Sequence, residues 1–258
     1  TAREDSSVSE GCRRTSGAIQ APRTQAELLL VRAAGCFTFG ATSRHMLRFQ
    51  IFGFPVAVHW VFWLITALLG GAAEASSPAA LKVLLIWVAA VFVSVLWHEL
   101  GHALVMRHFG ERQPQILLYG GGGLAMGRGF RTRKEQVLIS LAGPVAGLAL
   151  GVVVWLLAGM IPQGSAYVAA ALRDLIYINI FWSLVNLLPI VPLDGGRVSE
   201  AVLAGRGPLA LRISLVCAVA VAVFAFTQWR SIFVTLMFVV MAMDNWRTLN
   251  GRPTSGLM

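Results

Sequence analysis

Six apolar stretches of the chain are each close to the length that crosses a lipid bilayer. A bilayer core about 30 Å thick needs about 20 apolar residues in a helix. Hydrophobic residues make up 57% of the sequence and charged residues only 13%, whereas a soluble domain has about 25% charged residues. The pattern predicts an all-α polytopic membrane protein with about six transmembrane helices. They are expected at residues 55–73, 81–106, 137–161, 173–192, 209–227 and 231–244.

The basic residues are unevenly distributed between the segments that flank these stretches. The sequence holds 21 Lys and Arg against 12 Asp and Glu, a net charge of +9. One alternating set of flanks carries 13 of the Lys and Arg residues, and the other set carries 3. Because cytoplasmic loops are enriched in Lys and Arg, both termini are predicted to be cytoplasmic. Basic residues placed between apolar runs, and not on one soluble face, argue against nucleic-acid binding.

The first 45 residues differ from the rest of the chain. They are polar, mixed in charge and without a clear period, and the first methionine is Met46. We expect residues 1–45 to be an N-terminal extension that is disordered or not native. Residues 46–244 are expected to form the membrane domain, and residues 245–258 a short cytoplasmic tail. The three cysteines are too dispersed to indicate a disulfide framework or a metal site.

The second apolar stretch contains the sequence HELGH at residues 98–102. Residues four apart lie on one helix face, so His98 and His102 can bind one metal ion, while Glu99 can hold and deprotonate a bound water. This is the H-E-x-x-H arrangement of zinc proteases. A polar helix end with two surface histidines is the competing interpretation. Inside a membrane, however, each ionisable group costs about 2.5–3.5 kcal/mol and tends to be functional, and one zinc ion would satisfy all three.

A catalytic zinc usually has three protein ligands and a water, so this motif is one ligand short. The fourth stretch ends in NLLPIVPLDGG, residues 186–196. Pro189 and Pro192 cannot continue a regular helix, and the glycine pair permits a sharp turn. Irregular backbone at membrane depth is tolerated where it lines a cavity, and here it would deliver the carboxylate of Asp194 to the metal. Taken alone, Asp194 would be interpreted as an ordinary loop acid.

Three further features lie where they could serve such a site. Asn186 comes two turns before Asp194, and its amide is expected to hydrogen-bond a developing oxyanion; hydrogen bonding between helices is the alternative. Apolar residues flank a glycine cluster in residues 116–126, which predicts either a re-entrant hairpin near the zinc or an ordinary loop. Small residues at four-residue spacing in 140–151 are expected to pack the third stretch closely against the second.

The pairing of HELGH with NLLPIVPLDGG resembles the site-2 protease family of intramembrane zinc metalloproteases, over roughly residues 46–244. The resemblance implies that His98, His102 and Asp194 bind Zn²⁺ and that Glu99 is the general base. It also implies a three-helix catalytic core and hydrolysis of peptide bonds in transmembrane segments, as in regulated intramembrane proteolysis. A single-span membrane protein is the expected substrate, and the bacterial cytoplasmic membrane is the expected location.

Two other classes of protein remain open from the sequence. A metal-binding membrane transporter or channel can also line an ion path with His and Asp side chains, although it does not need Glu99 beside the first ligand. A transporter is therefore the alternative function. An inactive relative that acts as a membrane chaperone would have lost a ligand or the glutamate, and none is lost here.

Overall fold

The computed structural model describes most of the chain beyond its N-terminal region. The chain divides into two compact units, Thr1–Thr42 and Ser43–Met258, and every described residue belongs to the second. The predicted extension, residues 1–45, and the end of the predicted tail, residues 252–258, lie outside the described residues. The described residues are 46–127, 129, 131–161, 164–206 and 208–251.

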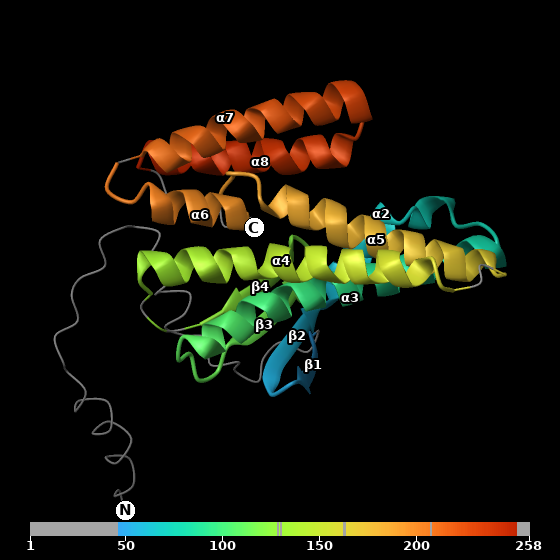
Figure 1. Cartoon of the computed structure of the whole chain (residues 1–258). Coiled ribbons are helices and arrows are strands. Elements are labelled where there is room, and N and C mark those ends of the chain that lie inside the picture. The colour runs from blue at the N-terminus through green and yellow to red at the C-terminus, as the bar shows by residue number, and fades with distance from the viewer. Residues whose placement is uncertain (1–45, 128, 130, 162–163, 207, 252–258) are drawn as a thin grey trace, which may run out of the picture. The chain divides into compact units, whose positions relative to one another are not determined.

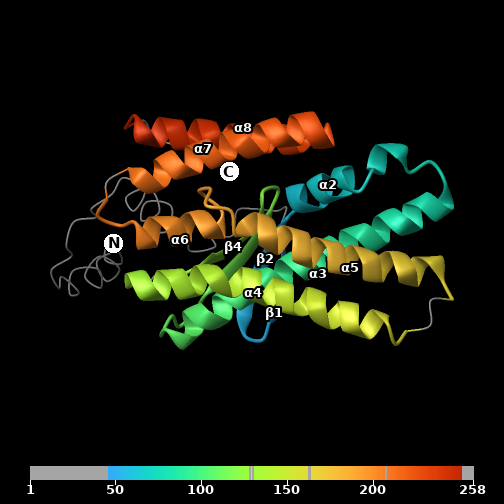
Figure 2. The same ribbon diagram turned by 45° about the horizontal axis from the view of Figure 1, so that its top comes forward.

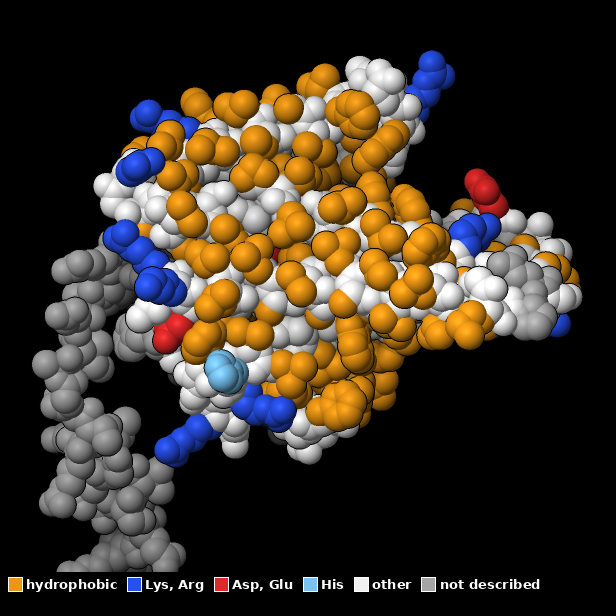
Figure 3. Space-filling model, viewed as in Figure 1, with side chains coloured by type: hydrophobic (Ala, Val, Ile, Leu, Met, Phe, Trp, Pro, Cys, Tyr) orange, Lys and Arg blue, Asp and Glu red, His pale blue; other side chains and the backbone are white. Residues whose placement is uncertain are grey.

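Five helices of this described part are long and apolar enough to cross a membrane. They coincide with the second to sixth predicted stretches. These helices are α3 (Pro78–His108), α4 (Arg133–Ala158), α5 (Ala166–Asn186), α7 (Leu209–Phe224) with its continuation η2 (Ala225–Trp229), and α8 (Ile232–Leu249) (Figure 1). On the face shown in Figure 3, hydrophobic side chains spread over the helices and Lys and Arg side chains lie toward the edges. The chain is therefore an integral membrane protein.

The first apolar stretch, residues 55–73, does not form the transmembrane helix that was predicted. It folds as strand β2 (Phe54–His59), the ten-residue helix α2 (Trp60–Leu69) and the short 3-10 helix η1 (Ala72–Glu74). The side chain of His59 accepts a backbone hydrogen bond and caps the start of α2. Ten helical residues rise only about 15 Å, so α2 alone is too short to cross a bilayer.

Strand β2 and helix α2 nevertheless follow α3 along its length, in the opposite direction. Near the end of α3, Arg107 donates a hydrogen bond of 3.2 Å to the carbonyl of Phe52, just before β2. Nearer its start, Trp87 donates one of 3.1 Å to the carbonyl of Thr66 in α2. Extended backbone is tolerated beside membrane helices only when its polar groups are paired. Both edges of β2 are paired with neighbouring strands.

The fold is mostly helical, as predicted, and it also contains a small four-stranded sheet to which β2 belongs. The strand order is β1-β2-β3-β4, with β2 and β3 parallel and the two outer pairs antiparallel. The glycine segment 116–126 lies in the β3–β4 hairpin, so a hairpin is present where one was considered. The remaining strands are β1 (Met46–Ile51), β3 (Gln115–Tyr119) and β4 (Gly122–Met126).

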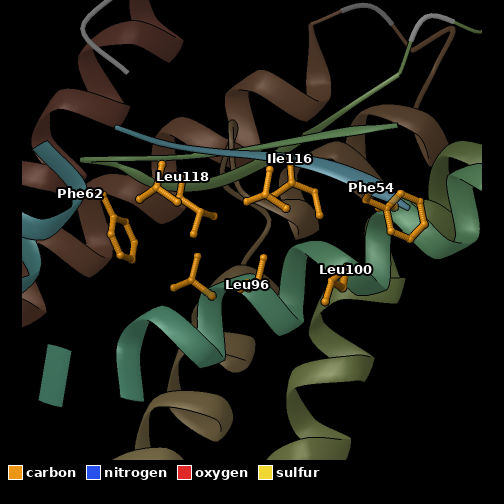
Figure 4. Close-up of a cluster of buried hydrophobic side chains, with 10 residues drawn as sticks. Phe54, Phe62, Leu96, Leu100, Ile116 and Leu118 are labelled. Carbon is orange, nitrogen blue, oxygen red and sulfur yellow. The ribbon is translucent and has the colours of Figure 1, made fainter. Parts of the chain in front are cut away.

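A hydrophobic core fills the space between this sheet and α3. Phe54, Ile116 and Leu118 project from the strands toward Leu96 and Leu100 on α3 (Figure 4). All five side chains are buried. Their burial fixes which side of α3 faces the sheet, and with it the direction in which the rest of the helix points its side chains.

Helix α4 packs closely against α3 through small residues, as predicted. Trp97 of α3 donates a hydrogen bond of 3.0 Å to the carbonyl of Ala146. One turn further along α3, a Cβ on Gly101 would overlap the carbonyl of Ala142. Residues later in α3 thus contact residues earlier in α4, so the two helices are antiparallel.

The same stripe of small residues on α4 also packs against α5, which the sequence did not indicate. A Cβ on Gly147 would overlap the hydroxyl of Ser183, and one on Gly151 would press on Ile180. Helices α4 and α5 are thus antiparallel as well. Since α4 is antiparallel to both partners, α3 and α5 run in the same direction, and together they form a three-helix core (Figure 2).

Candidate metal centre

Three ionisable side chains come together on α3, where His98 and His102 face away from the sheet and Glu99 lies beside them. His98, Glu99 and His102 are only 3–5% exposed, and each offers a ligand atom within 4.8 Å of the others. The two imidazole centroids are 4.9 Å apart, as expected for residues four apart on one helix face. Leu96 and Leu100 pack on the sheet, and residues two positions away on a helix point to nearly the opposite side. The hydrophobic core thus turns both histidines toward α4.

The carboxylate of Asp194, which comes from another segment of the chain, joins these three side chains. Its Oδ2 atom lies 3.0 Å from Nε2 of His98 and 3.2 Å from Nε2 of His102. Burial alone would raise the pKa of the Asp194 carboxyl, but its hydrogen bonds with His102 and His98 outweigh burial and hold that pKa well below its usual range. Asp194 is therefore an anion at neutral pH. The structure thus brings the two sequence motifs together.

Asp194 reaches this position because the α7–α8 hairpin holds the segment before it. The hydroxyl of Ser214 on α7 accepts a hydrogen bond of 2.8 Å from the Val191 N–H. The amide of Asn245 on α8 donates one of 2.9 Å to the Val191 carbonyl. Ile190 is fully buried in a cluster with Phe238 of α8. The irregular segment after α5 is thus held through the backbone of Val191 and the side chain of Ile190.

The two glycines after Asp194 allow close packing, which corrects the sharp turn predicted for them. Both lie inside α6 (Asp194–Val202). A Cβ on Gly195 would overlap the carbonyl of Leu187, and one on Gly196 would overlap the backbone of Ile190. Because neither glycine has a side chain, α6 starts directly against the end of α5, and its first residue faces the histidines.

Helix α4 supplies two contacts to the imidazoles that sequence reasoning did not identify. Nδ1 of His102 donates a hydrogen bond of 2.6 Å to the carbonyl of Ile139. Since a carbonyl can only accept, Nδ1 carries a proton, and Nε2 is the nitrogen that faces Asp194 and is left for a ligand. Gly143 lies against both imidazoles, where a Cβ would overlap His98 and His102. The small-residue spacing of α4 was its only signal, and it indicated helix packing alone.

Glu99 lies beneath strand β4, at the edge of the sheet. A Cβ on Gly123 would overlap the carboxyl group of Glu99, so the backbone of β4 passes directly over this side chain. In the sheet formed by the described residues, β4 pairs only with β3. An open strand edge therefore lies next to the carboxylate.

Asn186 is the last residue of α5 and is buried. Its Nδ2 atom donates a hydrogen bond of 2.9 Å to the carbonyl of Trp182 in its own helix. Among the hydrogen bonds of the described residues, none joins its side chain to His98, Glu99 or Asp194. Its predicted role toward an oxyanion remains a prediction.

The donor atoms of this centre suit a zinc ion. Two imidazole nitrogens and one carboxylate oxygen converge within hydrogen-bonding distance of one another, and Zn²⁺ in catalytic sites takes three such ligands and keeps a fourth position for water. One imidazole already has its Nδ1–H bonded to a carbonyl, which directs its Nε2 toward the other donors. Glu99 is buried beside these donors but is not needed as a ligand.

Comparisons with known proteins agree with this geometry. The sequence profile of Peptidase family M50 matches residues 86–174. A zinc metalloprotease of Methanocaldococcus jannaschii is 31% identical over 159 residues, which are 61% of this chain and 45% of that protein. Stage IV sporulation protein FB of Bacillus subtilis is 34% identical over 145 residues, 55% of this chain and 46% of that protein. The match thus spans about half the length of these curated relatives.

A solved structure has the same fold. The site-2 protease from Methanocaldococcus jannaschii superposes with a TM-score of 0.57 at 24% identity, covering 80% of this chain and 95% of that chain. The family match includes the HELGH sequence of α3, and the fold match covers most of the chain. Residues 86–174 thus match peptidase family M50, and the chain has the fold of a site-2 protease.

Proposed function

We propose that this chain is an intramembrane zinc metalloprotease that hydrolyses peptide bonds in the transmembrane segments of membrane proteins. The observation that carries the proposal is the convergence of His98, His102 and Asp194 beside Glu99, with two of the donors on a membrane-length helix. The names of its curated relatives support the same activity.

In this proposal the three donors hold Zn²⁺, which when bound lowers the pKa of a water and polarises the scissile carbonyl. Glu99 takes a proton from the attacking water and passes it to the leaving amine. Its burial beside the donors and beneath β4 keeps it within reach of both. Asn186 is proposed to hydrogen-bond the developing oxyanion, from its place at the end of α5.

The substrate is proposed to bind as an extended strand along the open edge of β4. A transmembrane helix hides its carbonyl groups in its own hydrogen bonds, so it must unwind before water can attack. Strand addition to a sheet edge supplies main-chain hydrogen bonds to such an unwound segment. Gly123 places that edge next to Glu99. A single-span membrane protein is the simplest substrate for this mode of binding.

We further propose that the chain lies in a bacterial cytoplasmic membrane with both termini in the cytoplasm. The metal centre lies in the half of α3 that ends at His108, and the flanks at that end carry most of the Lys and Arg residues. The passage of β2 and α2 alongside α3 restores the sixth crossing that this orientation needs. Cleavage is then expected toward the cytoplasmic end of the substrate helix.

The test compares the wild type with Glu99→Gln on a tagged single-span protein in proteoliposomes. The variant is expected to retain zinc and to lose about 10²–10⁴-fold in the rate of cleavage, the range for removing a general base. Chelation should abolish cleavage by the wild type, and added zinc should restore it. Cleavage by zinc-loaded Glu99→Gln at the wild-type rate would contradict the mechanism, and zinc transport without cleavage would favour a transporter.

A further inference from the structure

One imidazole of the metal centre has a buried nitrogen without a hydrogen-bond partner in the described part of the chain. His98 is 3% exposed, and its Nδ1 atom has no hydrogen-bond partner among the described residues. The equivalent atom of His102 is bonded to the carbonyl of Ile139. Imidazoles that bind metals almost always donate their second N–H to a carbonyl, a carboxylate or a water, and this bond fixes the tautomer and the ring orientation. His98 therefore needs an acceptor that its direct contacts do not provide.

Two more buried polar atoms without a partner lie on α5. They are Oδ1 of Asn179 and Oγ of Ser183, in residues that are 2% and 1% exposed. The other amide atom of Asn179, Nδ2, donates a hydrogen bond of 2.8 Å to the hydroxyl of Ser94 on α3. Buried polar atoms are rarely left unsatisfied, because each costs free energy in the folded state. Two such acceptors on one helix face indicate a bound donor.

The register of α3 and α5 puts these groups at similar heights along the two helices. The two helices run in the same direction and are joined by the hydrogen bond between Ser94 and Asn179. His98 is one turn beyond Ser94, and Ser183 is one turn beyond Asn179. The same step along both helices therefore sets the ring of His98 level with the hydroxyl of Ser183.

Helix α4 gives the same placement independently. Its Gly143 lies against Nε2 in the imidazole ring of His98, and its Gly147, one turn away, lies against the hydroxyl of Ser183. Both contacts are so close that a Cβ would overlap the side chain. The imidazole ring and the hydroxyl thus border adjacent turns of α4, at two positions where this helix carries no side chain.

We propose that a buried water molecule binds between α3 and α5 and orients His98 toward the metal. The water accepts the N–H of His98 Nδ1 and donates its two hydrogens to Asn179 Oδ1 and Ser183 Oγ. Three hydrogen bonds are the usual number for a buried water, and they satisfy all three unpartnered atoms. Asn179 and Ser183 are then positioning residues. This inference rests on the proposed function only in taking His98 as a zinc ligand.

The experiment measures zinc affinity of the full chain in detergent by competition with a chelator. Ser183→Ala removes one acceptor from the water and leaves the fold intact, and Thr66→Val removes a buried hydroxyl from α2 as the matched control. Zinc affinity is expected to fall about 10–100-fold in Ser183→Ala, as for other partners of ligating histidines, and to be unchanged in Thr66→Val. With Co²⁺ in place of zinc, the visible absorption spectrum of Ser183→Ala should shift, because the ligand field reports the orientation of His98.

Three results would overturn the inference or its basis. Wild-type affinity and an unshifted cobalt spectrum in Ser183→Ala would mean that the hydroxyl does not position His98. An equal loss of affinity in Thr66→Val would mean that Ser183→Ala acts through general destabilisation. A wild-type chain that binds no zinc would overturn the proposed function itself, whatever the variants do.

Discussion

The two sides of the metal centre are constructed in different ways. His98 and His102 stand on α3, a continuous helix of 31 residues, and their spacing follows from helix geometry alone. Asp194 is the first residue of α6, after the irregular segment that follows α5. Its position depends on contacts with α5, α7 and α8. The side of the two histidines, here called the helix side, is fixed by local structure. The side of Asp194, here called the loop side because the irregular segment 187–193 precedes it, is fixed by tertiary packing.

This difference has a consequence for the stability of the site. A helix-borne ligand moves only if α3 itself shifts, and α3 is locked between the sheet and α4. The loop-borne ligand can move whenever the α7–α8 hairpin loosens its hold on Val191. Substitutions of residues other than the ligands should therefore weaken zinc binding more when they lie on the loop side than when they lie on the helix side.

The largest expected effect comes from removing a ligand on either side. Asp194→Ala and His102→Ala should each reduce zinc affinity by well over the 10–100-fold typical of outer-shell partners, because each removes one of three protein ligands. Chelator competition on the purified variants measures this. If Asp194→Ala stayed within tenfold of the wild type while His102→Ala did not, the carboxylate would not be a ligand, and the loop side would have only a structural role.

The next largest effect should come from adding a methyl group at the closest backbone contacts. In Gly195→Ala the new Cβ meets the carbonyl of Leu187, and in Gly143→Ala it meets the two imidazoles. Overpacking costs about 1–3 kcal/mol. Backbone yields less than side chains, so Gly195→Ala should lower the unfolding temperature more than Gly143→Ala does.

Gly159→Ala serves as the control for both glycine variants, since its nearest neighbour lies 3.6 Å from the new Cβ, an ordinary contact, and its backbone is right-handed. It should unfold at the wild-type temperature or slightly above. Equal destabilisation of all three variants would show that the close contacts at Gly143 and Gly195 are not the cause of the lower unfolding temperature.

The contrast between the two sides also explains what the sequence could and could not predict. The HELGH motif carries its geometry within one helix, so the shared face of His98 and His102, with Glu99 beside it, follows from spacing. That Asp194 would join them was predictable from the proline break and the family resemblance. The contacts that place it were not, because Ser214 and Asn245 lie in other helices and have no spacing rule that links them to Val191.

The first apolar stretch shows the same limit for the fold. Residues 55–73 have the length and composition of a membrane helix, and hydropathy alone cannot distinguish a helix from a buried strand followed by a short helix. The choice is made by tertiary pairing, since β1 and β3 take up both edges of β2. In the same way, Gly143 and Ile139 act on the histidines only because α4 lies against α3.

A smaller effect should follow from cutting the tie between the break and α8. Asn245→Ala leaves the half-buried carbonyl of Val191 without the amide that now contacts it, a loss of about 1 kcal/mol. Asn250→Ala is the matched control, because the Asn250 amide donates only to Trp246 of its own exposed helix end. Unfolding temperature and zinc affinity should both fall in Asn245→Ala and hold in Asn250→Ala. A lower unfolding temperature with unchanged zinc affinity would show that the α7–α8 hairpin stabilises the fold but does not position Asp194.

The smallest effect is expected from two single hydroxyl deletions, one on each side. Ser77 caps the start of α3 by accepting a hydrogen bond from the Ala80 N–H, and loss of such a cap costs about 1 kcal/mol. His98 lies about six turns away along the helix, so Ser77→Ala should lower the unfolding temperature slightly and leave zinc affinity unchanged. Ser214→Ala loses a hydrogen bond of similar worth, but that bond holds Val191, three residues from Asp194. It should therefore lower zinc affinity as well. If both serine variants kept wild-type affinity, α7 would not contribute to placing the carboxylate, and the loop side would depend on α8 and the glycine contacts alone.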